Sequence, residues 1–144
     1  MKERKPIHDN WETPKDLYDK LNEEFSFNFD PCPLNSTFDG LDNNIKWGKV
    51  NFVNPPYSRK LKEAFIIRAY QEALKGNTSV LLLPVSTSTK IFHSYIYNIG
   101  YNSKIPEIRF LRGRVKFKGY NSKDELVSNK CGMHDSMIVI YRGI

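Results

Sequence analysis

One apolar run near the middle of the chain, residues 79–83, constrains the fold more than any other feature of the sequence. A strand with apolar side chains on both faces has to be covered on both faces, as the central strands of parallel sheets are. Residues 50–53 form a second short strand-like segment, and residues 59–75 have helical spacing and stop at Gly76-Asn77. This order of strand, helix and strand predicts an α/β fold.

The segments on either side extend this pattern. Thr13-Pro14 predicts a helix start, with Thr13 as the cap, and the helix should end near Glu24. The alternation of Phe25, Phe27 and Phe29 predicts a first strand that Asp30-Pro31 terminates. A polar loop should follow to about residue 46.

Further elements are expected after the central strand. Residues 87–98 have the pattern of a helix, and residues 107–117 and 137–141 that of late strands. The first of these should turn at Gly113 or Gly119 into a hairpin. The whole order predicts a mostly parallel sheet with an antiparallel end, in one domain over residues 1–144 that begins with a flexible arm, residues 1–10.

The charges are distributed unevenly along the chain. Lys and Arg number 22 against 16 Asp and Glu, a formal net charge of +6 that favours an anionic partner. Acidic residues concentrate before Asn54, whereas the basic stretch 109–118 contains no acid. If the protein has a binding site, one end of it should therefore suit a cation and the other end a phosphate backbone.

Several classes of protein fit the sequence poorly. No apolar run approaches the roughly 18 residues of a membrane span, and the first residues are polar rather than an apolar signal core. We therefore expect a cytoplasmic protein without membrane contact. Cys32 and Cys131 have neither metal-ligand spacing nor the density of a disulfide scaffold, so no metal and no bridge are predicted. The three histidines are scattered and none is interpreted as catalytic.

Two of the predicted strands end in unusual tetrapeptides, Asp30-Pro31-Cys32-Pro33 and Asn54-Pro55-Pro56-Tyr57. In a parallel sheet both would emerge at the same edge, where ligands of such sheets bind. The Asn54 side-chain oxygen and a proline carbonyl held outward by the rigid turn can accept both protons of a planar amino group, which activates its nitrogen. Tyr57 offers a ring on which a flat heterocycle can stack. The alternative is a strand-ending turn with a surface Tyr.

A series of motifs over about residues 10 to 141 carries a family resemblance: Trp11-Glu12-Thr13-Pro14, Phe29-Asp30-Pro31-Cys32, Asp39-Gly40-Leu41, Asn54-Pro55-Pro56-Tyr57-Ser58, Leu82-Leu83-Pro84 and Phe110-Leu111-Arg112-Gly113-Arg114-Val115-Lys116-Phe117. Together they resemble the small phage-encoded Dam-type group of the N6-adenine DNA methyltransferases. The resemblance implies S-adenosylmethionine as methyl donor, a compact Rossmann-like sheet, and a target adenine flipped out of the DNA duplex. If the protein is phage-encoded, the resemblance also implies that it is located in the cytoplasm of the host cell.

The resemblance implies roles for individual residues. Asn54, Pro55, Pro56 and Tyr57 would bind and activate the adenine amino group. The residues implied on the donor side are Trp11, Thr13, Pro14, Asp30, Pro31, Cys32, Asp39, Leu41 and Asp42. Within that set the Thr13-Pro14 helix start would face the donor's carboxylate, Asp30 its ammonium or sulfonium, and Asp39 or Asp42 its adenine.

The DNA would be held by the basic stretch. Arg112 and Arg114, two residues apart, would share a face with Lys116 if the segment is extended, and Phe117 could stack on the flipped base. Arg59 and Lys60, beside the acceptor tetrapeptide, are the other expected phosphate contacts. Sequence reading would fall to the polar loops 98–105 or 119–132.

Two other functions remain open at this point. The same tetrapeptide would serve a methyltransferase for another planar amine or amide, such as an RNA base or a protein glutamine. A non-catalytic nucleic-acid-binding relative that kept the fold is the other alternative. The basic stretch favours nucleic acid over protein, and donor binding would separate the catalytic from the non-catalytic function. The sequence leaves the oligomeric state and the target sequence open.

Overall fold

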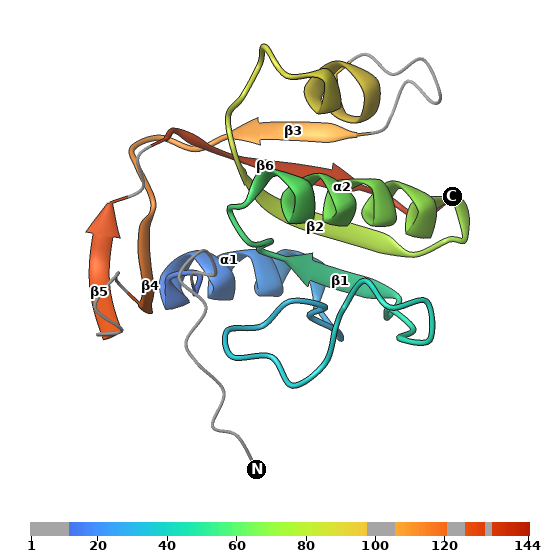
Figure 1. Cartoon of the computed structure of the whole chain (residues 1–144), viewed down its shortest axis with the longest axis horizontal. Coiled ribbons are helices and arrows are strands. Elements are labelled where there is room, and N and C mark those ends of the chain that lie inside the picture. Colours follow the sequence, from blue (N-terminus) through green and yellow to red (C-terminus); the bar gives the residue numbers. More distant parts are fainter. Residues whose placement is uncertain (1–11, 98–105, 121–125, 132–133) are drawn as a thin grey trace.

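The structure is a computed structural model that describes residues 12–97, 106–120, 126–131 and 134–144. Its main sheet has four strands in the order β1-β2-β6-β3, formed by Val50–Val53, Thr78–Pro84, Ser136–Tyr141 and Glu107–Phe110. A separate two-stranded sheet pairs β4, Lys116–Tyr120, with β5, Leu126–Cys131 (Figure 1). The α/β prediction is confirmed.

The main sheet is mixed. β1 and β2 are parallel, whereas β6 runs antiparallel to both of its neighbours, β2 and β3. β1, β2 and β3 therefore share one direction, but two of the three strand pairings are antiparallel, so the prediction of a mostly parallel sheet holds only for the pair β1-β2. The antiparallel strand, however, lies inside the sheet and not at its end, because the chain returns between β2 and β3 after forming the β4-β5 pair.

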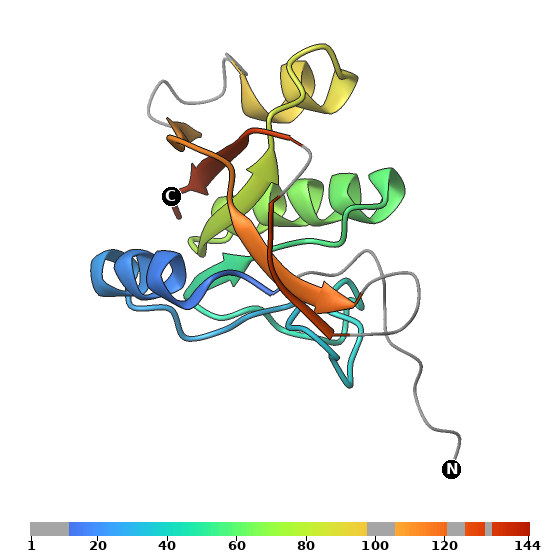
Figure 2. The ribbon, with the colours of Figure 1, turned by 90° about the vertical axis from the view of Figure 1, so that its left-hand side faces the viewer.

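Both faces of β2 are buried, as its apolar run predicts. Leu81 and Leu83 pack on the side of α2, Arg59–Leu74, and of the short π-helix η1, Phe92–Ile96. Val80 and Leu82 pack on the opposite side, with Leu21 of α1, Lys15–Phe25. Figure 2 shows α1 and α2 on the two sides of the sheet. The protein thus has an α1 face and an α2 face.

The predicted strand over Phe25–Phe29 is wrong in most of its length. α1 continues through Phe25 and ends at Ser26, which adopts the left-handed conformation with φ 55°. The Asn22 side chain then accepts the Phe27 N–H at 2.9 Å, so this backbone group pairs locally instead of with a strand. Phe29 alone keeps a parallel bridge, with Asn51 of β1.

The late elements also differ from the predictions. Residues 107–117 divide into β3 and β4 at Gly113, whose φ of +76° suits glycine, and β3 pairs with β6, so no hairpin forms at Gly113. The alternative, a hairpin after Gly119, is confirmed by the antiparallel pairing of β4 with β5, the next strand along the chain. Gly119 lies within β4, next to a register shift. The helix expected over 87–98 is shorter, with helical residues only from Lys90 to Ile96. β6 extends the predicted strand 137–141 by one residue.

The long loop after Phe29 is held against α2. Arg68 of α2 donates to the Ile45 carbonyl oxygen at 2.8 Å, and its guanidinium lies 5.1 Å from the centre of the Trp47 ring. The Trp47 indole N–H donates to the Gly40 carbonyl at 2.8 Å. These contacts order a loop without regular structure. In the described residues no helix is both long and apolar enough to cross a bilayer.

Candidate functional site

The two tetrapeptides meet at the carboxyl edge of β1. Asn54 directly follows β1, and Asp30 directly follows Phe29, which bridges to that strand. The Cys32 thiol donates to the Asn54 backbone carbonyl, with the sulfur 3.2 Å from the oxygen. The predicted convergence of the two turns is therefore confirmed, and it follows from the parallel pairing of the segments that precede them.

A cleft of about 740 Å³ opens at this convergence, on the α1 face. Its polar walls carry three carboxylates, those of Glu12, Asp16 and Asp30, and the amide of Asn54. Its other lining residues are Thr13, Pro14, Lys15, Tyr18, Cys32, Pro33, Leu34, Phe52 and Lys116. A space of this size can hold a small molecule, and its lining combines polar and charged side chains with the apolar surface of Phe52, Leu34 and the prolines.

Asp30 is the most perturbed carboxylate of the cleft. Burial raises its pKa to about 6, although the Cys32 N–H that it accepts at 2.9 Å acts in the opposite direction. Its charge also helps to raise the pKa of Tyr18, after the larger effect of burial on that hydroxyl. A carboxylate held in such surroundings is stabilised when a cation enters the cleft.

Thr13 was predicted to cap α1, and this prediction is wrong. The residue before the helix is Pro14, and no side chain bonds the first turn. The Thr13 hydroxyl instead accepts a hydrogen bond from the Asn54 amide nitrogen at 3.1 Å. This bond fixes the plane of the Asn54 amide and links the start of α1 to the end of β1.

Tyr57 and Phe117 form an aromatic pair beside the cleft. Their ring centres lie 5.7 Å apart with the planes at 88°, so the edge of one ring meets the face of the other. Phe117 is 5% exposed, whereas Tyr57 is 37% exposed and retains an accessible surface. Burial raises the pKa of the Tyr57 hydroxyl, which is therefore neutral at physiological pH. The turn at Gly113 is what brings Phe117 of β4 to this edge.

Part of the predicted donor site lies away from the cleft. Asp39 and Asp42 are exposed, and each carboxylate accepts a backbone N–H two residues ahead, which makes them turn formers. Leu41 packs against the core on the α2 face. Gly40 meets the Pro31 carbonyl so closely that an added Cβ would lie 1.8 Å from its oxygen, so this loop supports the Asp30-Pro31 turn from behind. Trp11 lies outside the described residues.

The basic stretch does not form one row of cations. Arg109 is bound by Glu24, through a pair of bonds at 2.7 and 2.8 Å, and by Glu107. Arg112 and Arg114 are exposed on either side of the bend at Gly113, so the extended geometry that would align them with Lys116 is absent. Arg114 approaches Asp135 at 3.9 Å. Of the predicted phosphate contacts on this stretch, Lys116 lines the cleft.

Other predicted residues are placed as follows. Arg59 and Lys60 are exposed in the first turn of α2, and Arg59 pairs with Glu63 at 3.2 Å. The loop 98–105 and residues 121–125 and 132, which belong to the segments expected to read sequence, lie outside the described residues.

The predictions omitted two acids of the cleft, Glu12 and Asp16, which flank the Thr13-Pro14 helix start. Their spacing of four residues around an N-terminal turn was the available signal, because carboxylates are favoured there by the helix dipole. The predictions also omitted Phe52 of β1, which lines the cleft. The alternation of side chains along a strand does not show which of its two faces borders a cleft.

Comparisons with known proteins give one match. No curated protein and no solved structure matches the chain. The family model described as DNA N-6-adenine-methyltransferase (Dam) matches residues 1–144, the full length of the sequence. Asn54-Pro55-Pro56-Tyr57 and the acid-lined cleft beside it are therefore features of a chain that belongs to the DNA N-6-adenine-methyltransferase (Dam) family.

Proposed function

We propose that this protein transfers a methyl group from S-adenosylmethionine to the exocyclic N6 amine of adenine in DNA, within the cleft on the α1 face. The observation that carries the proposal is the convergence of Asn54 with the partly buried Asp30 at one sheet edge, in a chain of the Dam family. We also propose a Rossmann-like fold in one domain. The shared direction of β1, β2 and β3, with the cleft beyond the carboxyl end of β1, supports it.

The described residues fit the donor. S-adenosylmethionine supplies an electrophilic methyl group on a positively charged sulfur, and it also carries an ammonium and a carboxylate. Asp30, Glu12 and Asp16 would hold the positive groups, and the exposed N–H groups at the start of α1 would hold the carboxylate. Tyr18 and Phe52 provide apolar wall for the nucleoside part. Pro31 and Cys32 hold Asp30 in place, because the Cys32 N–H donates to the Asp30 carboxylate and the Cys32 thiol ties that turn to the Asn54 carbonyl.

Asn54 would bind the adenine amine. Its side-chain oxygen and the Pro55 carbonyl would accept the two amine protons, which concentrates the lone pair on the nitrogen that reacts. Thr13 holds the amide plane of Asn54, and buried Pro55 and Pro56 keep the backbone turn rigid. The orienting groups are thus in place before the base arrives, which is the condition for strong electrostatic stabilisation.

Tyr57 would stack on the flipped adenine through its accessible ring. The contact with the Phe117 ring would hold the Tyr57 ring in position. No covalent enzyme intermediate is expected. Burial raises the pKa of the Cys32 thiol, which is thereby kept in its unreactive protonated form. Lys116, Arg112 and Arg114 would contact the DNA backbone near the cleft.

The test is a transfer assay with identification of the product. The full chain is incubated with methyl-labelled S-adenosylmethionine and unmodified genomic DNA, RNA or protein, and the DNA is digested to nucleosides. We expect label in N6-methyl-2′-deoxyadenosine from DNA alone, at a level that the Asn54→Ala variant does not reach. Label in RNA or in glutamine would overturn the choice of acceptor, and absence of donor binding by calorimetry would overturn catalysis.

A further inference from the structure

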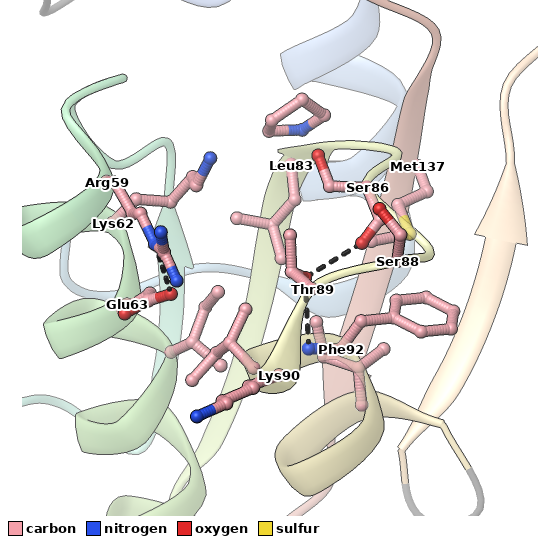
Figure 3. Close-up of a pocket in the computed structure, with 14 residues that line it drawn as sticks. Arg59, Lys62, Glu63, Leu83, Ser86, Ser88, Thr89, Lys90, Phe92 and Met137 are labelled. Carbon is pink, nitrogen blue, oxygen red and sulfur yellow. Dashed lines mark hydrogen bonds and ion pairs between the residues drawn. The ribbon is translucent and has the colours of Figure 1, made fainter.

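A second cavity lies at the same sheet edge on the α2 face. It has a volume of about 410 Å³ and lies between the first turns of α2 and the segment 86–92 that follows β2 (Figure 3). α2 begins two residues after Tyr57, so the mouth of the cavity is next to the acceptor tetrapeptide along the chain. Neither the catalytic residues nor the proposed donor site accounts for this cavity.

The mouth of the cavity is basic. Arg59, Lys62 and Lys90 line it, and the single acid of the lining, Glu63, is already paired with Arg59. Lys62 and Lys90 make no ion pair with any residue in the described part of the chain. Lys62 is also partly buried, which lowers its pKa and leaves its ammonium poorly solvated. Such a group gains from contact with an anion.

The interior of the cavity differs from its mouth. Ile66, Leu83, Phe92 and Met137 form an apolar floor that continues the core of the α2 face. Ser86 and Ser88 add hydroxyls to the lining, where each can donate or accept. A free phosphate would use only the mouth. A nucleotide would use both parts, with its base on the apolar floor and its phosphate on the lysines.

We propose that this cavity binds a second nucleotide of the DNA substrate, adjacent to the target adenine, and so contributes to sequence selection. The inference rests on the proposed function, since it assumes that DNA passes the Asn54 edge of the sheet. α2 begins two residues after Tyr57, so a DNA strand that presents adenine to Asn54 can continue over α2, where Lys62 and Lys90 offer ammonium groups. The class of ligand is a deoxynucleoside monophosphate unit.

The first experiment measures nucleotide binding without catalysis. The four deoxynucleoside monophosphates, the corresponding nucleosides and inorganic phosphate are titrated into the full chain, with NMR or calorimetric detection. We expect the nucleotides to bind more tightly than phosphate and at least one base to be preferred. Lys62→Gln should weaken nucleotide binding about tenfold through the lost charged contact. Lys49→Gln is the control, because this exposed lysine precedes β1 at the opposite edge of the sheet.

A second pair of variants tests the position of the site. Ser88→Trp places a large side chain at the entrance and should abolish nucleotide binding, whereas Thr87→Trp changes an exposed neighbour that does not line the cavity. Thermal unfolding of both variants checks that the fold is kept. In the transfer assay Ser88→Trp should retain donor affinity and lose discrimination at one base next to the methylated adenine.

The outcomes separate this inference from the proposed function. Methylation of adenine with unchanged sequence preference and nucleotide binding in Lys62→Gln and Ser88→Trp would overturn the second nucleotide site alone. Nucleotide binding that depends on these two residues, without any methyl transfer, would overturn the proposed function and keep the site. Equal binding of phosphate and nucleotides would also overturn the inference, because the apolar floor would then take no part.

Discussion

The cleft on the α1 face and the cavity on the α2 face lie at the same sheet edge and differ in the sign of their charge. The cleft on the α1 face contains Asp30, Glu12 and Asp16, whereas the cavity on the α2 face has Arg59, Lys62 and Lys90 at its mouth. The cleft is built on the end of β1, through Phe52 and Asn54, and the cavity on the end of its neighbour β2, through Leu83 and Pro84. Alternate side chains of such strands point to opposite faces. One short sheet edge can therefore offer a cation site on one face and an anion site on the other.

The comparison also shows how a linear charge distribution becomes a spatial one. The acid-rich first part of the chain does supply the acids of the cleft. The basic stretch 109–118, in contrast, is divided by the ion pairs of Arg109 with Glu24 and Glu107 and by the bend at Gly113. The cations of the second cavity come instead from α2 and the segment after β2.

The largest expected effect in the cleft is that of Asn54→Ala. Loss of one preorganised acceptor should lower the rate of methyl transfer on the order of 10²–10³-fold, with donor affinity changed only a few-fold. Transfer is measured with labelled donor, and donor affinity by calorimetry. Near-normal turnover would remove Asn54 from the reaction and with it the catalytic role of the cleft.

Asp30→Asn should act on donor affinity and on the pH dependence of stability. Without its negative charge the cleft should bind S-adenosylmethionine about tenfold more weakly. In the donor-free parent, the folded carboxyl keeps its proton up to pH about 6, whereas the unfolded chain releases it near 3.8. The free energy of unfolding should therefore fall by about 1–3 kcal/mol as pH rises through this window.

The Asp30→Asn variant should lack that decline, and denaturant titrations of both proteins between pH about 4 and roughly 7 measure it. Donor affinity in the parent should weaken below pH about 6, since the cationic donor favours the ionised carboxylate. A donor affinity that is equal in parent and variant at all pH values would move the donor out of this cleft.

Thr13→Val should have a smaller effect on the same chemistry. It removes the hydroxyl that accepts the Asn54 amide N–H and keeps the side-chain shape, so kcat should fall about five- to tenfold with little change in donor affinity. Thr13→Ser restores the hydroxyl and should recover most of the activity. Loss of donor affinity in the valine variant, with serine equally poor, would show that Thr13 contacts the donor instead of orienting Asn54.

The smallest effect is expected for the exposed arginines of the basic stretch. Replacing Arg112 and Arg114 by Gln should weaken DNA binding equally for all sequences and reduce the salt slope by about one to two units, since each phosphate contact contributes about 0.9. Anisotropy titrations over a range of salt concentrations give the slope. An unchanged slope, together with a reduced slope in Lys62→Gln, would place the DNA backbone on the α2 face.

Local patterns predicted much of the fold. The apolar run of β2, the helix α2 and the turn at Asn54-Pro55-Pro56 occur where the sequence indicates, because burial on both faces, helix-stop residues and paired prolines act over a few residues. The strand predicted over Phe25–Phe29 failed because Asn22 and Ser26 ended α1 by local hydrogen bonds that alternation does not reveal.

The candidate site was predictable to a similar extent. The meeting of Asp30 and Asn54 follows from two strand-ending turns in a parallel pair, and the structure brings them together through Cys32. Asp39, Leu41 and Asp42 were assigned by motif position, yet they stabilise turns and core away from the cleft. Spacing along the chain does not report which side of a loop faces the solvent.

The sequence by itself determined the α/β class, the family motifs and the residue types of the proposed reacting centre, since these depend on short segments and their order. Only the tertiary structure decided that β6 lies inside the sheet, that Thr13 contacts Asn54 across 41 positions, and that Phe117 reaches Tyr57. These are contacts between distant segments, and their geometry depends on how the two faces of one sheet are covered.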